Sequence, residues 1–543
     1  MDCSVIPPAN ICSICFCIQI LRVFTFQFWN IHTGRNSMSQ KLLEDAGFLS
    51  LNTIPFQTKS GTSSFLEILQ TATIPNGIRK AIQRKQTITS LRTLSEKTKE
   101  TWKTWFSEIS HLEKSLEKQQ ASQSDILQDT ISQITFQHEW FKQLNYIPFV
   151  LFGLACFKIY LVPAMAILMP FLTILLPYAY IRYSAKLPIP FSEYLKLVWK
   201  LWSGTGGDQP MNTRSAVQGI TLLFTFAQGI IQPIQNAKHC SNTDTFLVEL
   251  GEQLLNLKRL YTNFETSVQQ NSIVFSFPKG FAETFSKDPR QLAVYFLENP
   301  LQITTLQKHL GKLECLFVLS CQQEFNAVSF LKPSPFPYLH ISGLQDIQIS
   351  KEKRILSELL LHSKTHHSLL TGPNGGGKSS SLRAILQSVL LAQTFGYAPV
   401  HSMTIRPFRW ILSGLLLQDS PGKKSMFESE VHFAASLLER KAGPGLVLFD
   451  ELFHSTNPPD GIRTATCFLQ NLWKLHHIAS VVSTHVFELV DNAPTEIQKL
   501  CVPGSKNPNG TFTFSYKLQP GICKVSSVER IWKKEGLICS NCG

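Results

Sequence analysis

A glycine-rich segment followed by lysine and serine is the clearest place in the sequence where residue types and spacing could do chemistry. Gly372, Gly377, Lys378 and Ser379 satisfy the pattern G-x-x-x-x-G-K-[ST], directly after the short apolar run 368–370. Small residues at this spacing let successive backbone N–H groups turn toward a phosphate, and the amino end of a following helix adds its positive dipole. The pattern predicts a phosphate-binding loop; the alternative, a chance match in a glycine-rich turn, is disfavoured by these flanking patterns.

The two polar ends of this loop have separate predicted roles. Lys378 supplies positive charge to the β- and γ-phosphates, and the Ser379 hydroxyl ligates Mg²⁺. The predicted cofactors are therefore ATP and Mg²⁺. The predicted nucleotide-contacting residues are Gly372, Pro373, Asn374, Gly375, Gly376, Gly377, Lys378, Ser379 and Ser380.

Two further apolar runs end in residues suited to hydrolysis. The run 445–449 leads into Asp450, a second Mg²⁺ ligand, and Glu451, which can polarise the attacking water. The run 478–483 leads into His485, which could contact the γ-phosphate or the water. An ordinary acid pair at a strand end and a structural histidine are the alternatives, and the upstream loop favours the catalytic interpretation of Glu451, Lys378 and His485.

The elements that must position these residues change in character along the chain. After the proline-rich junction 332–337, strand-like apolar runs alternate with helical segments, which indicates an α/β domain. The regions before it are predominantly helical in pattern. The predicted order is a leader (1–45), a helical region (46–146), a membrane segment (147–183), a second helical region (184–332), the α/β domain (333–537) and a tail (538–543).

The segment 147–181 carries a single charge, Lys158, and 159–181 is an uncharged run of 23 residues. About 20 apolar residues span a bilayer core as a helix. The alternative is a buried helix of a soluble protein, which Pro163, Pro170 and Pro177 disfavour because membrane helices tolerate proline better. We expect membrane association, either as one tilted span or as a tight two-pass hairpin.

Composition narrows the classes of function. The chain has 543 residues, 16% charged residues, a net charge of +13 and a mean hydropathy of +0.01. Low charge content argues against a disordered tail or a heavily charged coiled coil, and the basic balance favours phosphate backbones or anionic lipid. Eight basic residues within 79–103 form either a phosphate-contacting face or a solvated helix face. Thirteen cysteines are too sparse for a disulfide scaffold and favour a reducing compartment.

Six ordered motifs between about 340 and 537 resemble the MutS family of DNA mismatch-repair ATPases. Residues 371–380 resemble the loop TGPNMGGKST, with Gly375 in place of methionine. The other five similar segments are 390–399 (LLAQ…G-[FY]-V-P-A), 425–430 (STFMVE), 450–461 (DE[IL]GRGTSxxDG), 483–489 (ATHxxEL) and 516–521 (YKLxxG). Weaker similarity to the family's helical core extends upstream.

The resemblance implies a fold and an assembly. The fold would be an α/β P-loop NTPase of the ABC-ATPase-like MutS domain V type, after a mainly α-helical lever and core region that a transmembrane segment interrupts. Two ATPase domains would form a homodimer, and Ser425 of each would reach the nucleotide bound by the other. ATP binding would then change the geometry of the dimer and of its lever arms.

Three departures from the family pattern bear on DNA recognition. The sequence shows no pattern for the N-terminal mismatch-reading and connector domains. Phe106 and Glu108 lack the context of the family's Phe-x-Glu wedge, and 453–458 reads FHSTNP where the family has GRGTST. We therefore expect a chain that does not read mismatches itself.

Three functions remain in competition. The first is a membrane-anchored, MutS-like ATPase that acts on DNA, with its ATPase domain on the cytoplasmic side. The alternative is an ABC-type membrane ATPase with no nucleic-acid role, for which 412–414 (LSG) is only a partial signature. The third is a degenerate ATPase kept as a scaffold, which the intact Lys378, Ser379, Asp450 and Glu451 disfavour.

Overall fold

The chain forms two compact units. A computed structural model describes residues 34–50, 54–73, 77–121, 131–132, 134–147, 149–203, 213–278, 288–415, 426–440, 443–453, 455–507 and 512–525. The first unit, called here the sheet unit, comprises 1–107, 266–276 and 305–543, and the helical unit comprises 108–265 and 277–304. This division differs from the expected boundaries, because helices of the first predicted helical region pack onto the α/β domain.

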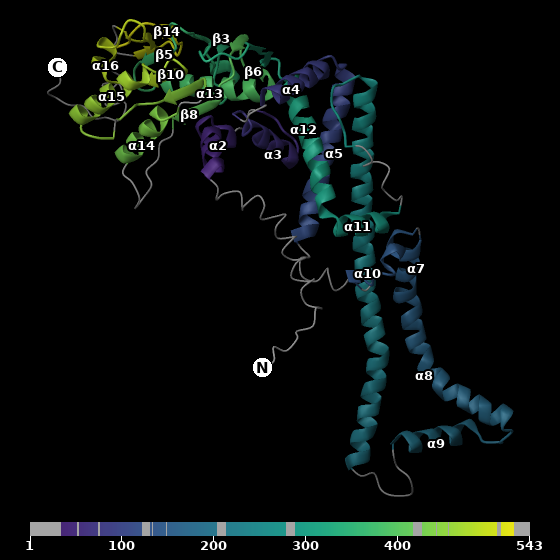
Figure 1. Ribbon diagram of the computed structural model, residues 1–543. Helices are drawn as coiled ribbons and strands as arrows, with labels where there is room; N and C mark the ends of the chain where they lie inside the picture. The colour runs from purple at the N-terminus through teal and green to yellow at the C-terminus, as the bar shows by residue number, and fades with distance from the viewer. Residues whose placement is uncertain are drawn as a thin grey trace, which may run out of the picture. The chain divides into compact units, whose positions relative to one another are not determined.

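A six-stranded sheet forms the centre of the sheet unit (Figure 1). Its order is β14 (Gln519–Pro520), β11 (Gln498–Cys501), β5 (His367–Thr371), β10 (Ile478–Ser483), β9 (Gly445–Phe449) and β8 (Trp410–Gly414). Neighbouring strands from β11 to β8 are parallel, and β14 is antiparallel to β11. Every residue of β5, β8, β9 and β10 is buried, as expected where helices cover both faces of a parallel sheet.

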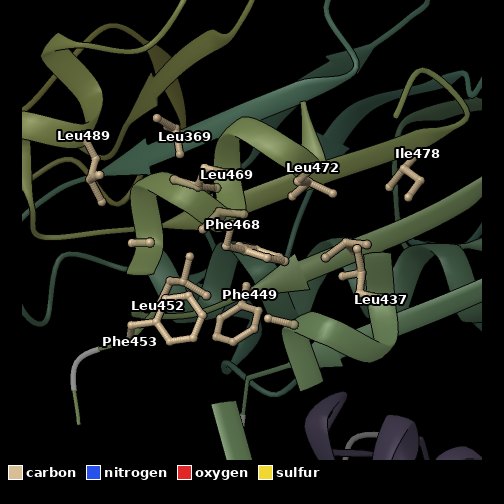
Figure 2. Close-up of a cluster of buried hydrophobic side chains, with 14 of the residues drawn as sticks. Leu369, Leu437, Phe449, Leu452, Phe453, Phe468, Leu469, Leu472, Ile478 and Leu489 are labelled. Carbon is tan, nitrogen blue, oxygen red and sulfur yellow. The ribbon is translucent and has the colours of Figure 1, made fainter. Parts of the chain in front are cut away.

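Four helices of this unit follow strands of the sheet or lead into them. They are α13 (Lys378–Phe395), α14 (Met426–Leu438), α15 (Pro458–Leu472) and α16 (Phe487–Asp491). Figure 2 shows the apolar cluster that joins the sheet to α14, α15 and α16, with Phe449, Phe468 and Leu469 among its buried members. The ring of Phe433 packs edge-on against that of Phe449 at 5.3 Å. This core fixes the strands whose carboxyl ends carry the candidate site.

Smaller sheets complete the unit. A four-stranded sheet has the order β2 (Ser329–Phe330), β7 (Ser402–Ile405), β3 (Leu339–Leu344) and β4 (Ser357–Leu361). Two pairs are formed by β1 (Asn326–Ala327) with β6 (Tyr397–Ala398) and by β12 (Gly504–Lys506) with β13 (Phe512–Phe514). A short 3-10 turn, η7 (Lys351–Lys353), precedes β4.

Helices from the amino-terminal part of the chain pack into the same unit. They are α2 (Gly34–Asp45), η3 (Phe48–Ser50), α3 (Lys59–Leu69), α4 (Gly77–Arg92), the start of α5 (Glu96–Ala121) and most of α12 (Pro300–Cys321). Both α3 and α4 contact α13, the helix that follows the glycine-rich loop.

Three residues of the basic run 79–103 attach α4 to the rest of the sheet unit. Arg84 donates to the carbonyl of Thr394 at 2.9 Å, and Lys85 donates to that of Val328 at 2.8 Å. Arg92 donates to the carbonyls of Gln322 and Phe325. Neither expectation for the run, a phosphate-contacting face or a solvated face, holds for these three residues, because their charges are already bound to backbone oxygens.

The helical unit is built from long helices. It contains the rest of α5, η4 (Lys142–Tyr146), α7 (Val150–Cys156), η5 (Phe157–Leu161), α8 (Val162–Ala179), η6 (Tyr180–Ser184), α9 (Phe191–Ser203), α11 (Pro289–Glu298) and most of α10 (Thr213–Gln270). Figure 1 shows α10 as one long helix.

The elements from α7 to η6 form a continuous helix, Val150–Ser184, in which η5 and η6 are π-helical turns. Among the described residues this helix alone meets the length and hydropathy requirements for crossing a membrane, and no residue of its most apolar 18-residue window is buried. A tight hairpin within 147–181 is therefore not what the segment forms.

Candidate nucleotide-binding site

The candidate site lies at one edge of the six-stranded sheet. Leu370 of β5 is paired with Ser483 of β10, and Val482 is paired with Phe449 of β9. The three parallel strands therefore end together, and the segments that follow them start at the same edge. The structure thus brings together the glycine-rich loop, the acid pair and the histidine, which the sequence separates by up to about a hundred residues.

The loop connects β5 to α13 in a conformation that requires glycine. Gly377 precedes α13 with φ +106°, a value that L side chains rarely adopt. A Cβ on Gly376 would lie 2.9 Å from the carbonyl oxygen of Pro373, closer than a real contact allows. Asn374 and Gly375 are exposed at the loop's tip. The predicted helix over 380–391 is longer at both ends, since α13 begins at Lys378 itself.

Lys378 curls back over the loop. Its ammonium group donates to the carbonyls of Gly372 at 3.2 Å and Pro373 at 3.3 Å. Burial lowers the pKa of this amine, and the charges of Glu451 and Asp450 oppose the shift. A partly desolvated cation near two carboxylates is suited to attract a phosphate group, because the missing water makes its charge more effective. Ser379 is exposed and Ser380 is half-buried.

The acid pair is held by a serine at the end of β10. The Ser483 hydroxyl donates to Oδ1 of Asp450 and accepts from the backbone N–H of Glu451 at 3.0 Å. Glu451 has φ +51°, a left-handed conformation that costs a residue other than glycine about 1–2 kcal/mol. Its Oε1 lies 2.8 Å from Nε2 of His485. Both side chains keep just over a third of their surface exposed, so water reaches them.

Reasoning from sequence did not assign a site role to Ser483 or Tyr516. Ser483 could have been recognised as the polar last residue of an apolar run beside the acids. Tyr516 lies on the far carboxy-terminal segment, and its Cδ1 would be 3.4 Å from a Cβ on Gly377. No local pattern indicates that contact, since it depends on how 512–525 folds back over the loop.

Two predicted features of the dimer interface differ in what the structure describes. Ser425 lies outside the described residues, as does His454. In the segment that replaces the family's GRGTST, Phe453 is buried in the hydrophobic core and Ser455 donates to Glu430 at 2.7 Å. This segment is therefore anchored to α14 and α15 within its own sheet unit.

Two other motifs have structural rather than recognition roles. Residues 412–414, the partial ABC signature, form the end of β8 and are buried. Phe106 is also buried, in contact with the rings of Trp102 and Phe317. Neither segment is therefore presented to a nucleotide or a DNA base in this conformation.

A mixed sheet with the glycine-rich loop, an acid pair and a histidine at one edge defines the class of domain, and comparison with known proteins gives its family. Residues 368–536 match the description of MutS domain V. The resemblance is thus confirmed for this region: it is a MutS-family domain V.

Curated relatives include mismatch-repair proteins. The chain is 34% identical over 173 residues to the mitochondrial DNA mismatch repair protein MSH1 of Arabidopsis thaliana, covering 31% of this chain and 15% of that protein. It is 28% identical over 231 residues to MutS of Leuconostoc citreum (strain KM20), and 27% over 239 residues to MutS of Prochlorococcus marinus (strain MIT 9312). Those matches cover 40% and 41% of this chain, but in each case only 26% of the relative.

Proposed function

We propose that this chain is a MutS-like ATPase that binds DNA in an ATP-dependent manner, is anchored in a membrane through 147–183, and does not read mismatches itself. The observation that carries the proposal is the convergence of the loop, the acid pair and His485 at the ends of β5, β9 and β10.

The chain's own residues would divide the work of hydrolysis. Backbone N–H groups of 372–380 would hold the phosphates of ATP, and Lys378 would release its two carbonyl partners to bind phosphate oxygens. Ser379 and Asp450 would hold Mg²⁺, which neutralises phosphate charge when bound. Ser483 keeps Asp450 in place.

Glu451 would orient the water that attacks the γ-phosphorus. Its hydrogen bond to His485 fixes the carboxylate, and the strained backbone turns that carboxylate toward the histidine. The new bond forms between the water oxygen and phosphorus, the bond to the ADP oxygen breaks, and the water's proton passes to solvent or to phosphate. Both residues act by positioning, as in other phosphoryl-transfer sites.

DNA is the proposed macromolecular partner. The net charge of +13 favours a polyanion, and the relatives are named as DNA mismatch repair proteins. A second copy of the chain, joined through the ATPase domains with Ser425 at the partner's nucleotide, is proposed from the motif alone. The comparisons and the buried 412–414 strand disfavour the ABC-type alternative.

The membrane is the second proposed partner, on the evidence of the exposed apolar helix Val150–Ser184. The seven cysteines in the described part of the chain are all thiols without a disulfide, in keeping with a sheet unit on the cytoplasmic, reducing side.

Turnover of ATP by the detergent-solubilised full chain tests the enzymatic part of the proposal. Glu451→Gln should lower kcat by about 10²-fold or more, because the carboxylate that orients the water is lost. Glu496→Gln is the matched control, since Glu496 is an exposed acid of the same unit. Equal turnover in the two variants would refute the role of Glu451.

A further inference from the structure

We propose that the first half of α10 is a second membrane-crossing helix, so that the helical unit enters a lipid bilayer as an antiparallel hairpin with α9 at the far interface. The inference deepens the proposed membrane anchoring and rests on it. Nothing in the sequence pattern of 147–183 alone requires a second crossing.

The first observation is an uncharged run in α10 that matches the one in the Val150–Ser184 helix. Residues 215–237 contain no charged side chain, between Arg214 and Lys238, and the run is 23 residues long. The run 159–181, between Lys158 and Arg182, is also 23 residues long. At 1.5 Å per residue each run extends about 35 Å, enough to cross a hydrocarbon core about 30 Å thick.

The second observation is that this half of α10 presents apolar side chains outward. Val217, Ile220, Phe224, Ile231 and Ile234 are exposed to 45–68% of their surface. Such a continuous apolar surface is unusual for a water-solvated helix, and a lipid bilayer is the surrounding that suits it.

Burial within the helical unit begins where the uncharged run ends. The first buried residues of α10 among those described from 217 onward are Ala237 and Cys240. On the other helix, Leu151 and Ala155 are buried, and no residue from 156 to 193 is. Both helices therefore leave the folded part of the unit at corresponding points.

A charge contact places these two departure points close together. Burial raises the pKa of the Cys240 thiol, and the positive charge of Lys158 opposes that rise. The start of one uncharged run thus lies near the end of the other, which is the arrangement of an antiparallel hairpin. Lys158 and Lys238 would mark one membrane interface, and Arg182 and Arg214 the other, as cationic anchors do.

The polar groups of the run are arranged in a way that a membrane tolerates. Thr221 donates to the carbonyl of Val217 and Thr225 to that of Thr221, both at 2.8 Å, so these hydroxyls are satisfied within the helix. Gln228, Gln232 and Gln235 follow at intervals of four and three and share one side. They make this helix less apolar than its neighbour, and a hairpin would let that side face protein rather than lipid.

Helix α9, between the two runs, has the pattern of an interfacial helix. Glu193, Lys196 and Lys200 lie on one side, and the exposed apolar residues Leu195 and Trp199 lie on the other. The Tyr194 hydroxyl donates to the carbonyl of Ile174 at 2.9 Å, which fastens α9 to the far end of α8. This places α9 at the opposite membrane surface from Lys158.

Cysteine labelling of the full chain in sealed vesicles tests the hairpin. Glu139→Cys, Lys196→Cys and Glu252→Cys each place a probe at an exposed position before the hairpin, on α9 and after it. A membrane-impermeant maleimide is added before and after permeabilisation, and the unmodified chain gives the background. The hairpin predicts that the Glu139 and Glu252 variants label alike and that the Lys196 variant labels from the opposite face.

The other outcomes separate the hairpin from the anchoring. Labelling of the Glu139 and Glu252 variants from opposite faces would overturn the hairpin and leave a single span intact. Labelling of all three from one face would overturn both. Release of the unmodified chain by alkaline carbonate would refute the anchoring itself. Phe224→Arg should disturb the topology, whereas Glu252→Arg, outside the run, should leave it unchanged.

Discussion

At the residue scale, the two loop glycines with positive φ make different demands. Gly375 has φ +74°, close to the left-handed region, and a Cβ there would meet nothing within 4 Å. Gly377 has φ +106°, and a Cβ there would meet the ring of Tyr516 at 3.4 Å. The family's methionine at the position of Gly375 agrees with the space around it. The two glycines therefore form a matched pair for a test of the loop.

Alanine at these positions should separate the two demands. Gly375→Ala should cost about 1 kcal/mol of nucleotide affinity, roughly fivefold, because the left-handed region is accessible to alanine. Gly377→Ala should cost about 2–3 kcal/mol, roughly 30- to 150-fold, because the backbone must move. Calorimetric titration with ATP and Mg²⁺ measures both, and equal losses would contradict the described loop conformation.

Two buried histidines should make the sheet unit sensitive to acid. Burial lowers the pKa of His366 and lowers that of His367 well below the ordinary 6.5, and neighbouring histidines add to both shifts. The unfolded chain therefore binds protons first as the pH falls. The stabilising contribution is complete above about pH 6.5 and is lost as the pH falls toward the folded-state pKa values.

Thermal or urea unfolding between pH 7.5 and 5.5 measures this effect. His367→Asn keeps a partner for Ser480, whose hydroxyl lies 2.8 Å from Nδ1 of His367, and removes the titration. The variant should lose about 1 kcal/mol less than the parent chain over the acid unit below pH 6.5. His432→Asn, at an exposed position, is the control, and identical pH profiles for all three chains would argue against the assignment.

At the element scale, α4 is held to the sheet unit by side chains that look like a nucleic-acid surface in the sequence. The Arg92 guanidinium lies over the Tyr397 ring at 4.8 Å, in addition to its two carbonyl partners. Arg84 approaches the Phe395 ring at the end of α13. Since α13 begins at Lys378, these contacts connect the amino-terminal helices to the helix that follows the nucleotide loop.

Removing one of these attachments should destabilise the unit. Arg92→Ala should lower the free energy of unfolding by about 1–3 kcal/mol, because charged hydrogen bonds to carbonyls are lost. Lys97→Ala, at an exposed position of the same basic run, should change it by less than about 0.5 kcal/mol. Urea unfolding followed by far-ultraviolet dichroism compares the two, and equal effects would place Arg92 on a solvated face after all.

The sequence predicts those parts of the fold that depend on local pattern. The loop 372–379 and the buried runs that became β5, β9 and β10 have local signatures, and so has the long apolar helix. Residues whose roles depend on distant partners have none. Ser483, Tyr516 and Arg92 acquire theirs from segments brought together by folding, so composition and spacing could not assign them.

At the scale of the whole molecule, a sheet unit with the nucleotide site is combined with a helical unit that carries long apolar helices. The chain spans about a sixth to a quarter of the curated relatives that it matches, so those proteins' mismatch recognition cannot be transferred to it. The element shared with them is domain V. An ATP-dependent DNA function in this chain would therefore have to operate through domain V and the helices specific to this chain.

The most direct test of the account is ATP turnover by the solubilised full chain with branched, mismatched or plain duplex DNA, with lipid alone, and with neither. The proposed function predicts turnover that at least one DNA changes, that lipid alone does not reproduce, and that Glu451→Gln abolishes. Because mismatch reading is not proposed, mismatched and plain duplexes should act alike. Turnover that responds to lipid and ignores every DNA would contradict the account and favour a membrane ATPase without a nucleic-acid partner.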